Sequence, residues 1–195
     1  MTNYEKIRII CEKNNGMITT SMAAEENIPR WYLSDMVEKN QLYRIARGIY
    51  LTEGGDMDDY YFFQLINSRC IYSFSSALYL HGLTDRIPFS KEVTVYKGYN
   101  SSHITDDTII HYVEKRIYDM GITECATMFG NIVRVYNKER TICDLIANRK
   151  NIDVEIFSKA LKKYALDPER DYRKLRQYAK AMKISEKVDS ILEVL

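Results

Sequence analysis

The side chains that most often carry catalysis or hold metals are not spaced for either task in this sequence. The three histidines (His81, His103 and His111) do not lie at the spacing of metal ligands, and the four cysteines form no Cys-x-x-Cys pair. The serines within residues 73–76 lack the Gly-x-Ser-x-Gly turn of an esterase nucleophile, and the glycines are isolated rather than gathered in a phosphate-binding loop. We therefore expect no enzyme, no cofactor and no bound metal.

Hydrogen bonding to nucleic acid is the chemistry that the N-terminal quarter favours. Arg30 can hold the edge of a guanine with two hydrogen bonds, a contact that contributes about 1–3 kcal/mol of discrimination. Arg44 and Arg47 flank a turn whose basic side chains would meet the DNA backbone or the minor groove. The residues that we expect to contact DNA are Thr20, Ser21, Arg30, Trp31, Tyr32, Ser34, Lys39, Arg44 and Arg47.

The pattern around these residues predicts three short helices followed by a hairpin. A one-sided helix over 4–14 ends at Asn-Asn-Gly, hydroxyls at 19–21 can cap a second helix, and Asn27 suits a left-handed turn before a third helix at about 29–40. Two β-type runs then hinge near 46–48, with a glycine at the turn. This order is typical of a winged helix-turn-helix, in which the third helix lies in the major groove of DNA.

Charge alone does not distinguish a winged helix that binds DNA from one that docks proteins. Residues 1–52 carry seven Lys or Arg and six Asp or Glu, so any DNA affinity must depend on a few placed arginines. Asp35 and Glu38 on the third helix would repel phosphate, which keeps the protein-docking alternative open. We expect Tyr32 and Asp35 to occupy outward positions of this helix, and Trp31 to be a partly buried packing residue at its edge.

The segment Glu53-Gly54-Gly55-Asp56 is the expected boundary between a winged helix-turn-helix over 1–54 and a mixed α+β domain over 55–195 that ends in a run of helices. Asp56 is expected to cap the first helix of the second domain. The expected elements there are helices at 57–67 and 73–80, strands at 70–72, 92–97 and 108–113, a hairpin over 123–136, and helices from Lys138 onward with breaks near Asn148, Asp167 and Ile184.

The C-terminal helices are rich in cations. Residues 149–187 hold twelve Lys or Arg against six Asp or Glu. Such charge is usually a solvated face, but the excess makes contact with an acidic partner, either protein or RNA, a second hypothesis. The residues assigned to such a partner are Lys159, Lys162, Lys163, Arg173, Arg176 and Lys180.

Three segments, taken in order, resemble the AbiE antitoxin family, the AbiEi-like proteins of bacterial abortive-infection toxin–antitoxin systems. They are RIARGIYL at 44–51, SFSSALYLHGLTD at 73–85 and ERTICDLI at 139–146. The resemblance implies that the N-terminal domain binds inverted repeats in the promoter of its own operon and represses it. It also implies that the C-terminal domain counteracts a nucleotidyltransferase-like toxin, in the type IV manner that needs no stable complex with the toxin.

Carried onto this sequence, the resemblance assigns a wing and several signature positions but no catalytic residue. The wing positions are Arg44, Arg47, Gly48 and Tyr50. The signature positions, which serve either the fold or antitoxicity, are Ser76, Leu80, His81, Gly82, Glu139, Arg140 and Asp144. The chain departs from its relatives at the end of the third helix, where they commonly have glycine, but Asn40 can adopt the same left-handed backbone.

The sequence thus predicts a cytoplasmic bacterial antitoxin that also represses its own operon, with double-stranded operator DNA and a nucleotidyltransferase-like toxin as partners. Whether the toxin is contacted directly is open at this point. No run of about 18 apolar residues indicates a membrane span. No heptad seam indicates a coiled-coil dimer, which favours monomers that pair only on DNA. The alternative is a winged-helix transcription regulator whose C-terminal domain senses a ligand or partner and has no antitoxin role.

Overall fold

The computed structural model describes residues 1–104 and 107–193, and the chain divides into two compact units, residues 1–66 and 67–195. Both units combine helices with a sheet, so the chain has the mixed α+β class that its sequence predicts. The division falls after Ile66, whereas the sequence pattern placed it after Gly54. Within the described ranges, no helix is long and apolar enough to cross a membrane.

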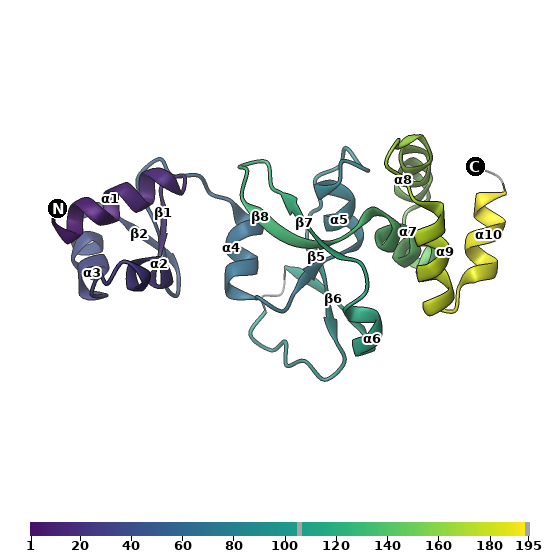
Figure 1. The fold of residues 1–195 in the computed structure, drawn as a ribbon, viewed down its shortest axis with the longest axis horizontal. Helices are drawn as coiled ribbons and strands as arrows, with labels where there is room; N and C mark the ends of the chain where they lie inside the picture. Colours follow the sequence, from purple (N-terminus) through teal and green to yellow (C-terminus); the bar gives the residue numbers. More distant parts are fainter. Residues whose placement is uncertain (105–106, 194–195) are drawn as a thin grey trace. The chain divides into compact units, whose positions relative to one another are not determined.

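The first unit builds a small sheet among four helices. Its elements are α1 (Asn3–Lys13), β1 (Met17–Thr19), α2 (Thr20–Glu25), α3 (Trp31–Glu38), β2 (Tyr43–Ala46), β3 (Ile49–Leu51) and α4 (Asp59–Ile66) (Figure 1). The strands form an antiparallel sheet in the order β1-β3-β2. The helices and the hairpin β2–β3 lie where the sequence pattern predicted them. Strand β1 was not expected, because three residues are too few for a periodic signal.

Short polar side chains begin and end the helices of this unit. Thr2 forms a capping box with Glu5 at the start of α1, and Thr19 accepts a hydrogen bond from a backbone N–H in the first turn of α2. Asn27 and Asn40 take left-handed φ values of 56° and 55°, as predicted for the turns before and after α3. Local sequence signals therefore set the ends of these helices.

Helix α4 packs in the first unit rather than in the second. Its Phe62 is buried against apolar side chains of β1 and β3. The predicted cap of this helix was wrong by two residues: Asp58, not Asp56, accepts a hydrogen bond from the backbone N–H of Tyr61, at 3.0 Å. The apolar face of α4 thus completes the small core, which explains why the boundary lies after this helix and not before it.

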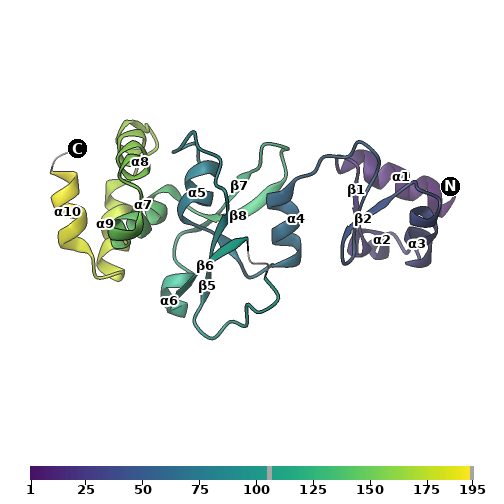
Figure 2. The ribbon, with the colours of Figure 1, turned by 180° about the vertical axis from the view of Figure 1, so that it is seen from behind.

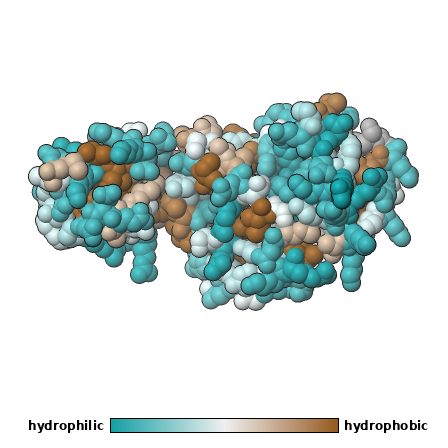
Figure 3. Space-filling model, viewed as in Figure 1, coloured by the Kyte–Doolittle hydropathy of each residue, from teal (hydrophilic) through white to brown (hydrophobic). Residues whose placement is uncertain are grey.

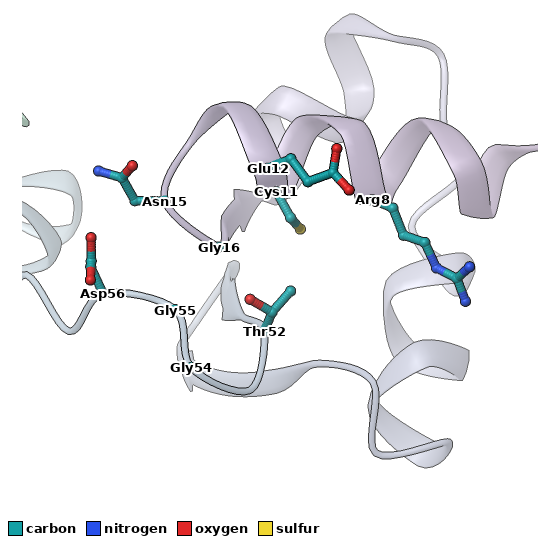
Figure 4. A pocket seen from close by; sticks show the side chains of 9 residues that line it. All are labelled: Arg8, Cys11, Glu12, Asn15, Gly16, Thr52, Gly54, Gly55 and Asp56. Carbon is teal, nitrogen blue, oxygen red and sulfur yellow. The ribbon is translucent and has the colours of Figure 1, made fainter.

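The turn after α1 and the segment after β3 meet at two glycines. Gly16 has a left-handed φ of 86°, and a Cβ atom there would lie 2.5 Å from the Cα of Gly55. Backbone hydrogen bonds run from Thr52 N to Gly16 O at 2.8 Å and from Asp56 N to Asn15 O at 3.0 Å. Figure 4 shows these segments at the edge of an open cavity of about 370 Å³. Glycine is required because any side chain would force the two backbones apart.

Replacing Gly16 with alanine is expected to destabilise the first unit by about 3 kcal/mol, because the methyl group would meet backbone and the left-handed φ would be strained. Gly54→Ala is the matched control: its φ is 79° but its Cβ would have no atom within 4 Å, so we expect a strain of about 1 kcal/mol. Urea unfolding followed by the fluorescence of Trp31, the only tryptophan, measures both losses. Equal losses would show that the close approach has no energetic role.

The second unit is a five-stranded mixed sheet followed by a run of helices, counted over the residues that are described. Its elements are β4 (Ile71–Tyr72), α5 (Phe74–Leu80), β5 (Lys91–Tyr96), β6 (Thr108–Val113), α6 (Lys115–Tyr118), β7 (Ile122–Ala126), β8 (Ile132–Tyr136), α7 (Lys138–Ala147), the 3-10 helix η1 (Arg149–Asn151), α8 (Val154–Leu166), α9 (Tyr172–Ala181) and α10 (Ser185–Leu192). The strand order is β6-β5-β4-β8-β7, with parallel pairs β5–β6 and β4–β8. Figures 1 and 2 show α7 to α10 gathered at one end of this unit.

Helix α5 joins the sheet to the C-terminal helices. Phe74 and Leu78 of α5 share one apolar core with Ile142, Leu161 and Leu175 of the helices that follow. The same helix also contacts β5. The breaks between α7, α8, α9 and α10 lie where the sequence predicted them, whereas α6 and η1 were not expected because each is about one turn long. Helix α5 therefore connects the sheet with the apolar core that the C-terminal helices share.

Candidate nucleic-acid interface

One stripe of α3 faces away from the core of the first unit. Leu33 and Met36 are buried, whereas Trp31, Ser34 and Glu38, which share a face at i, i+3 and i+7 spacing, are exposed. The side chain of Arg30, at the N-cap of α3, is also exposed. The structure thus confirms the outward position of Arg30 and Ser34 that the sequence predicted.

Tyr32 and Asp35 turn toward α1 instead of outward, which corrects the prediction for both. The ring of Tyr32 lies edge-on to that of Tyr4, with 5.0 Å between centroids. The hydroxyl of Tyr4 donates to Asp35 Oδ2 at 2.7 Å, and Lys39 Nζ donates to the same oxygen at 2.7 Å. The hydrogen bond from Lys39 and then that from Tyr4 lower the pKa of Asp35. The negative charge of Asp35 would repel a DNA phosphate, but the ion pair with Lys39 compensates this charge.

Trp31 is more exposed than its sequence context suggested. We expected a partly buried packing residue, but 56% of its surface is accessible to solvent. One side of the indole stacks on the ring of Tyr32, with 3.7 Å between centroids and 26° between planes. The reason is that the buried side of α3 is already filled by Leu33 and Met36, so the first residue of the helix is left on the outer side.

The hairpin β2–β3 presents two arginines next to the start of α2. Arg44 and Arg47 are exposed, and Arg44 Nε donates to the carbonyl of Ala46 at 3.4 Å across a bulge. The backbone N–H of Thr20 donates to Gly48 O at 2.9 Å. A Cβ on Gly48, whose φ is 78°, would lie 2.8 Å from the hydroxyl oxygen of Thr20. Thr20 therefore fits against the hairpin turn, and its neighbour Ser21 is the exposed hydroxyl of the pair.

The six basic residues assigned to an acidic partner divide into two sets. The paired set is Lys159 with Glu155, Lys163 with Asp85 and Arg176 with Asp189, at N–O distances of 2.7–3.2 Å. The other set, which we call the free cations, is Lys162, Arg173 and Lys180; these exposed side chains make no ion pair with any residue of 1–104 or 107–193. In the view of Figure 3 the surface over α8 and α9 is mainly hydrophilic. Only half of the predicted basic residues thus keep an uncompensated charge.

Arg140, one of the signature positions, lies in the interior of the second unit and is fully buried. Its Nε donates to Asp144 Oδ1 at 3.0 Å, and its Nη1 donates to the carbonyls of Ile117 and Met120. The guanidinium lies 4.0 Å from the centroid of the Tyr136 ring. Burial raises the pKa of Asp144, and the adjacent Arg140 opposes that rise. The ion pair lies within α7, and the two hydrogen bonds from Arg140 Nη1 join α7 to the segment around α6.

The other signature positions also make contacts inside the second unit. Ser76 Oγ accepts a hydrogen bond from the backbone N–H of the second residue of β5 at 2.8 Å. His81 Nε2 donates to the backbone carbonyl at the end of β8 at 2.7 Å, and burial lowers the pKa of this imidazole. Glu139 is buried and accepts from the hydroxyl of Tyr164 at 3.3 Å. Gly82 has a left-handed φ of 67° after α5, and Leu80 is half-buried. The buried members are out of reach of a macromolecular partner.

A cavity of about 520 Å³ lies in the second unit among α5, β5, β6, α7 and α8. At its wall, His111 Nε2 donates to Glu92 Oε2 at 2.9 Å, and the imidazole stacks on Phe74 with 3.9 Å between centroids. Phe74 has a left-handed φ of 46°, which is strained for a residue with a Cβ atom. No local pattern signals this cavity, because its walls come from segments far apart in the sequence. Over the described residues, no three potential metal ligands lie together.

The comparisons with known proteins concern the first unit most directly. Residues 5–52 match the family described as "Transcriptional regulator, AbiEi antitoxin". No curated protein matches the chain significantly. Among solved structures, the crystal structure of the RV2827C protein from Mycobacterium tuberculosis is similar to this chain, with a TM-score of 0.52 and 10% sequence identity over 97% of this chain and 80% of that one. At this identity the likeness concerns the fold alone.

Proposed function

Because residues 5–52 carry the domain of the AbiEi antitoxin family of transcriptional regulators, we propose that this chain is an antitoxin that represses its own operon. In this proposal the first unit is a winged helix-turn-helix that occupies inverted repeats in the promoter. The second unit counteracts a nucleotidyltransferase-like toxin in the type IV manner. The protein acts in the bacterial cytoplasm, where its operator lies, and its monomers pair on the two half-sites of that operator.

The order of elements in the first unit supports the DNA-binding half of the proposal. A helix, a strand, two helices joined by a sharp turn and a two-stranded hairpin follow one another, as in a winged helix-turn-helix. The outward stripe of α3 would enter the major groove, with Arg30 at the leading end. Arg44 and Arg47 of the hairpin, which would be the wing, would then meet phosphate or the minor groove. The pairing of Asp35 with Lys39 removes an obstacle to this placement.

The direct test is an electrophoretic mobility shift with the DNA upstream of the chain's own gene. We expect a sequence-selective complex that weakens as salt is raised, because phosphate contacts release counterions. A duplex of the same length and composition in scrambled order is the control. Equal affinity for both duplexes would overturn the repressor half of the proposal. Binding by only one protomer per operator would overturn the pairing on half-sites.

The free cations Lys162, Arg173 and Lys180 support an acidic surface as the target of the second unit. Arg173 and Lys180 lie two turns apart on one face of α9, so their charges add along a stripe. The buried signature positions contribute the frame that carries α8 and α9. We propose that antitoxicity depends on the free cations and not on the paired cations, whose charge is already matched by Glu155, Asp85 and Asp189.

Changing the free cations Lys162, Arg173 and Lys180 to alanine together is expected to reduce rescue of growth by about tenfold when the neighbouring toxin gene is co-expressed. Repression of the operon should be unchanged. The matched control removes the same charge from the paired set, Lys159, Lys163 and Arg176, and is expected to retain most of the rescue. If the variant of the paired set lost more rescue than the variant of the free cations, the assignment of antitoxicity to the free cations would be contradicted.

A second candidate function is a regulator whose second unit senses a small molecule and has no antitoxin role. The cavity beside Glu92 and His111 favours it, because a strained Phe74 in the wall is a feature that folds retain mainly at functional sites. Co-expression with the adjacent toxin gene separates the two candidates. If the toxin still arrests growth at full antitoxin expression while operator binding is intact, the regulator without antitoxin role is the correct function.

A further inference from the structure

Trp31 is an exposed side chain that the fold nevertheless holds in one orientation. Its indole leaves 56% of its surface in water, although Trp is a residue whose burial normally contributes much to a core. Tyr32 supports one side of the ring, Tyr4 supports Tyr32 edge-on, and Asp35 accepts a hydrogen bond from the hydroxyl of Tyr4. This chain of contacts from α1 pre-organises the ring before any partner binds, which lowers the entropic cost of a contact.

The position of the ring indicates what it would contact. Trp31 follows Arg30 directly and shares the outward stripe of α3 with Ser34 and Glu38. If this stripe faces the major groove, an arginine, a hydroxyl and a carboxylate meet polar base edges there. The only apolar group that base pairs present in the major groove is the 5-methyl group of thymine. An indole among polar neighbours therefore has one matching feature in DNA.

We propose that Trp31 reads a thymine in each operator half-site by packing the exposed part of its indole against the 5-methyl group of that base. The inference rests on the proposed operator binding and names the base, thymine, and the group of that base, its 5-methyl group, that Trp31 contacts. The contact gives α3 a second residue that recognises a base, beside Arg30. The apolar surface that it buries adds binding free energy that the small net charge of the N-terminal segment does not supply. The other exposed residues of the stripe, Ser34 and Glu38, are polar, which argues against an apolar protein surface as the partner of Trp31, because docking patches for such surfaces are contiguous.

The test uses the full chain and a duplex of its own upstream DNA in which one thymine at a time is replaced by deoxyuridine, which lacks the methyl group. We expect one position per half-site at which this replacement weakens binding about fourfold, the effect of one buried methyl group. The Trp31→Ala variant should bind the unmodified duplex more weakly and lose its sensitivity at that position. The Ser34→Ala variant is the matched control on the same stripe and should keep the sensitivity. Circular dichroism verifies that each variant is folded.

The fluorescence of Trp31 gives an independent readout, since the chain has no other tryptophan. We expect the unmodified duplex to change the emission more than the deoxyuridine duplex at equal occupancy. If Trp31→Ala keeps the thymine sensitivity while sequence-selective binding persists, the inference is wrong and the proposed function stands. Absence of sequence-selective binding overturns both. A change of emission with protein concentration alone, without DNA, would assign Trp31 to a contact between copies of the chain and would also overturn the inference.

Discussion

Replacing Arg44 and Arg47 together with alanine is expected to weaken binding to operator and unrelated DNA alike and to flatten its dependence on salt. Both side chains are exposed on the hairpin β2–β3 and make no ion pair within the described residues. If each contacts one phosphate, the slope of log K against log salt concentration should fall by about 1.8 for each bound protomer, which corresponds to two phosphates at about 0.9 each. Binding isotherms at four salt concentrations give this slope.

The same charge can be removed from elsewhere in the first unit as a control. Arg8 and Lys13 of α1 are exposed, and neither belongs to α3 or to the hairpin. Their double alanine variant loses two positive charges but no predicted phosphate contact, so the salt slope should change little. Arg30→Ala is the contrasting variant, since it should relax the preference for operator over unrelated DNA by about 5–150-fold, the range expected for one bidentate base contact of about 1–3 kcal/mol. An equal loss of slope in the Arg8 and Lys13 variant would refute the placement of the hairpin on DNA.

The Arg140→Met variant is expected to destabilise the second unit by about 3–5 kcal/mol, because it leaves the carboxylate of Asp144 buried without its partner. Two backbone carbonyls, of Ile117 and Met120, also lose their donor. Thermal unfolding followed by far-ultraviolet circular dichroism measures the loss. The fluorescence of Trp31 serves as the internal control, because this residue lies in the first unit and should report an unchanged transition.

The double variant Arg140→Met with Asp144→Leu distinguishes the cost of an unpaired buried charge from the cost of losing the packing of the Arg140 side chain. Replacing both charges with apolar groups removes the uncompensated carboxylate, so part of the stability should return. The pH dependence of the stability of Arg140→Met also tests whether an unpaired carboxylate causes the loss. Burial raises the pKa of Asp144, so the folded state of Arg140→Met binds a proton that the unfolded state releases, and the loss should shrink as pH falls from 7 toward 4. A double variant no more stable than Arg140→Met would contradict this account.

The ends of the elements in the first unit were predictable because their causes are local. Thr19 caps α2, and Asn27 and Asn40 take the left-handed backbone at the turns that flank α3. A short polar side chain acts within three residues of its own position, so the sequence alone contains the signal. The same reasoning missed the cap of α4 by two residues, because several acids stand next to one another between Asp56 and Asp59 and each fits the pattern.

The direction of individual side chains depends on partners that are remote in the sequence. Tyr32 and Asp35 turn toward Tyr4, which lies on α1, and this contact leaves Trp31 as the exposed aromatic residue of α3. Periodicity predicts which face of a helix is buried, but it does not resolve residues at the border between the two faces. Seven of the candidate DNA contacts are exposed: Ser21, Arg30, Trp31, Ser34, Lys39, Arg44 and Arg47. Of these, Lys39 pairs with Asp35, and the remaining two candidates, Thr20 and Tyr32, are half-buried.

Which basic side chains of the C-terminal helices are paired also depends on the tertiary structure. The sequence shows the excess of cations over residues 149–187 but not which of them are compensated. Asp85 lies far from Lys163 along the chain, yet their side chains meet at 2.7 Å, and Arg176 meets Asp189 of another helix. Pairing of this kind follows from the packing of α5, α8, α9 and α10. Among the six cations assigned to a partner, Lys162, Arg173 and Lys180 are the ones that make no ion pair within the described residues.

By itself, the sequence determined the α+β class, the order of helices and hairpin in the first unit, and the family to which residues 5–52 match, because periodicity, caps and short motifs act over neighbouring residues. The tertiary structure decided that α4 belongs with the first unit, that Arg140 and Asp144 form a buried pair, and that Trp31 rather than Tyr32 is exposed on α3. Each of these features depends on which segments, distant in the sequence, pack together. That packing is determined by the burial of apolar surface from the whole chain, so no single segment contains the signal for it.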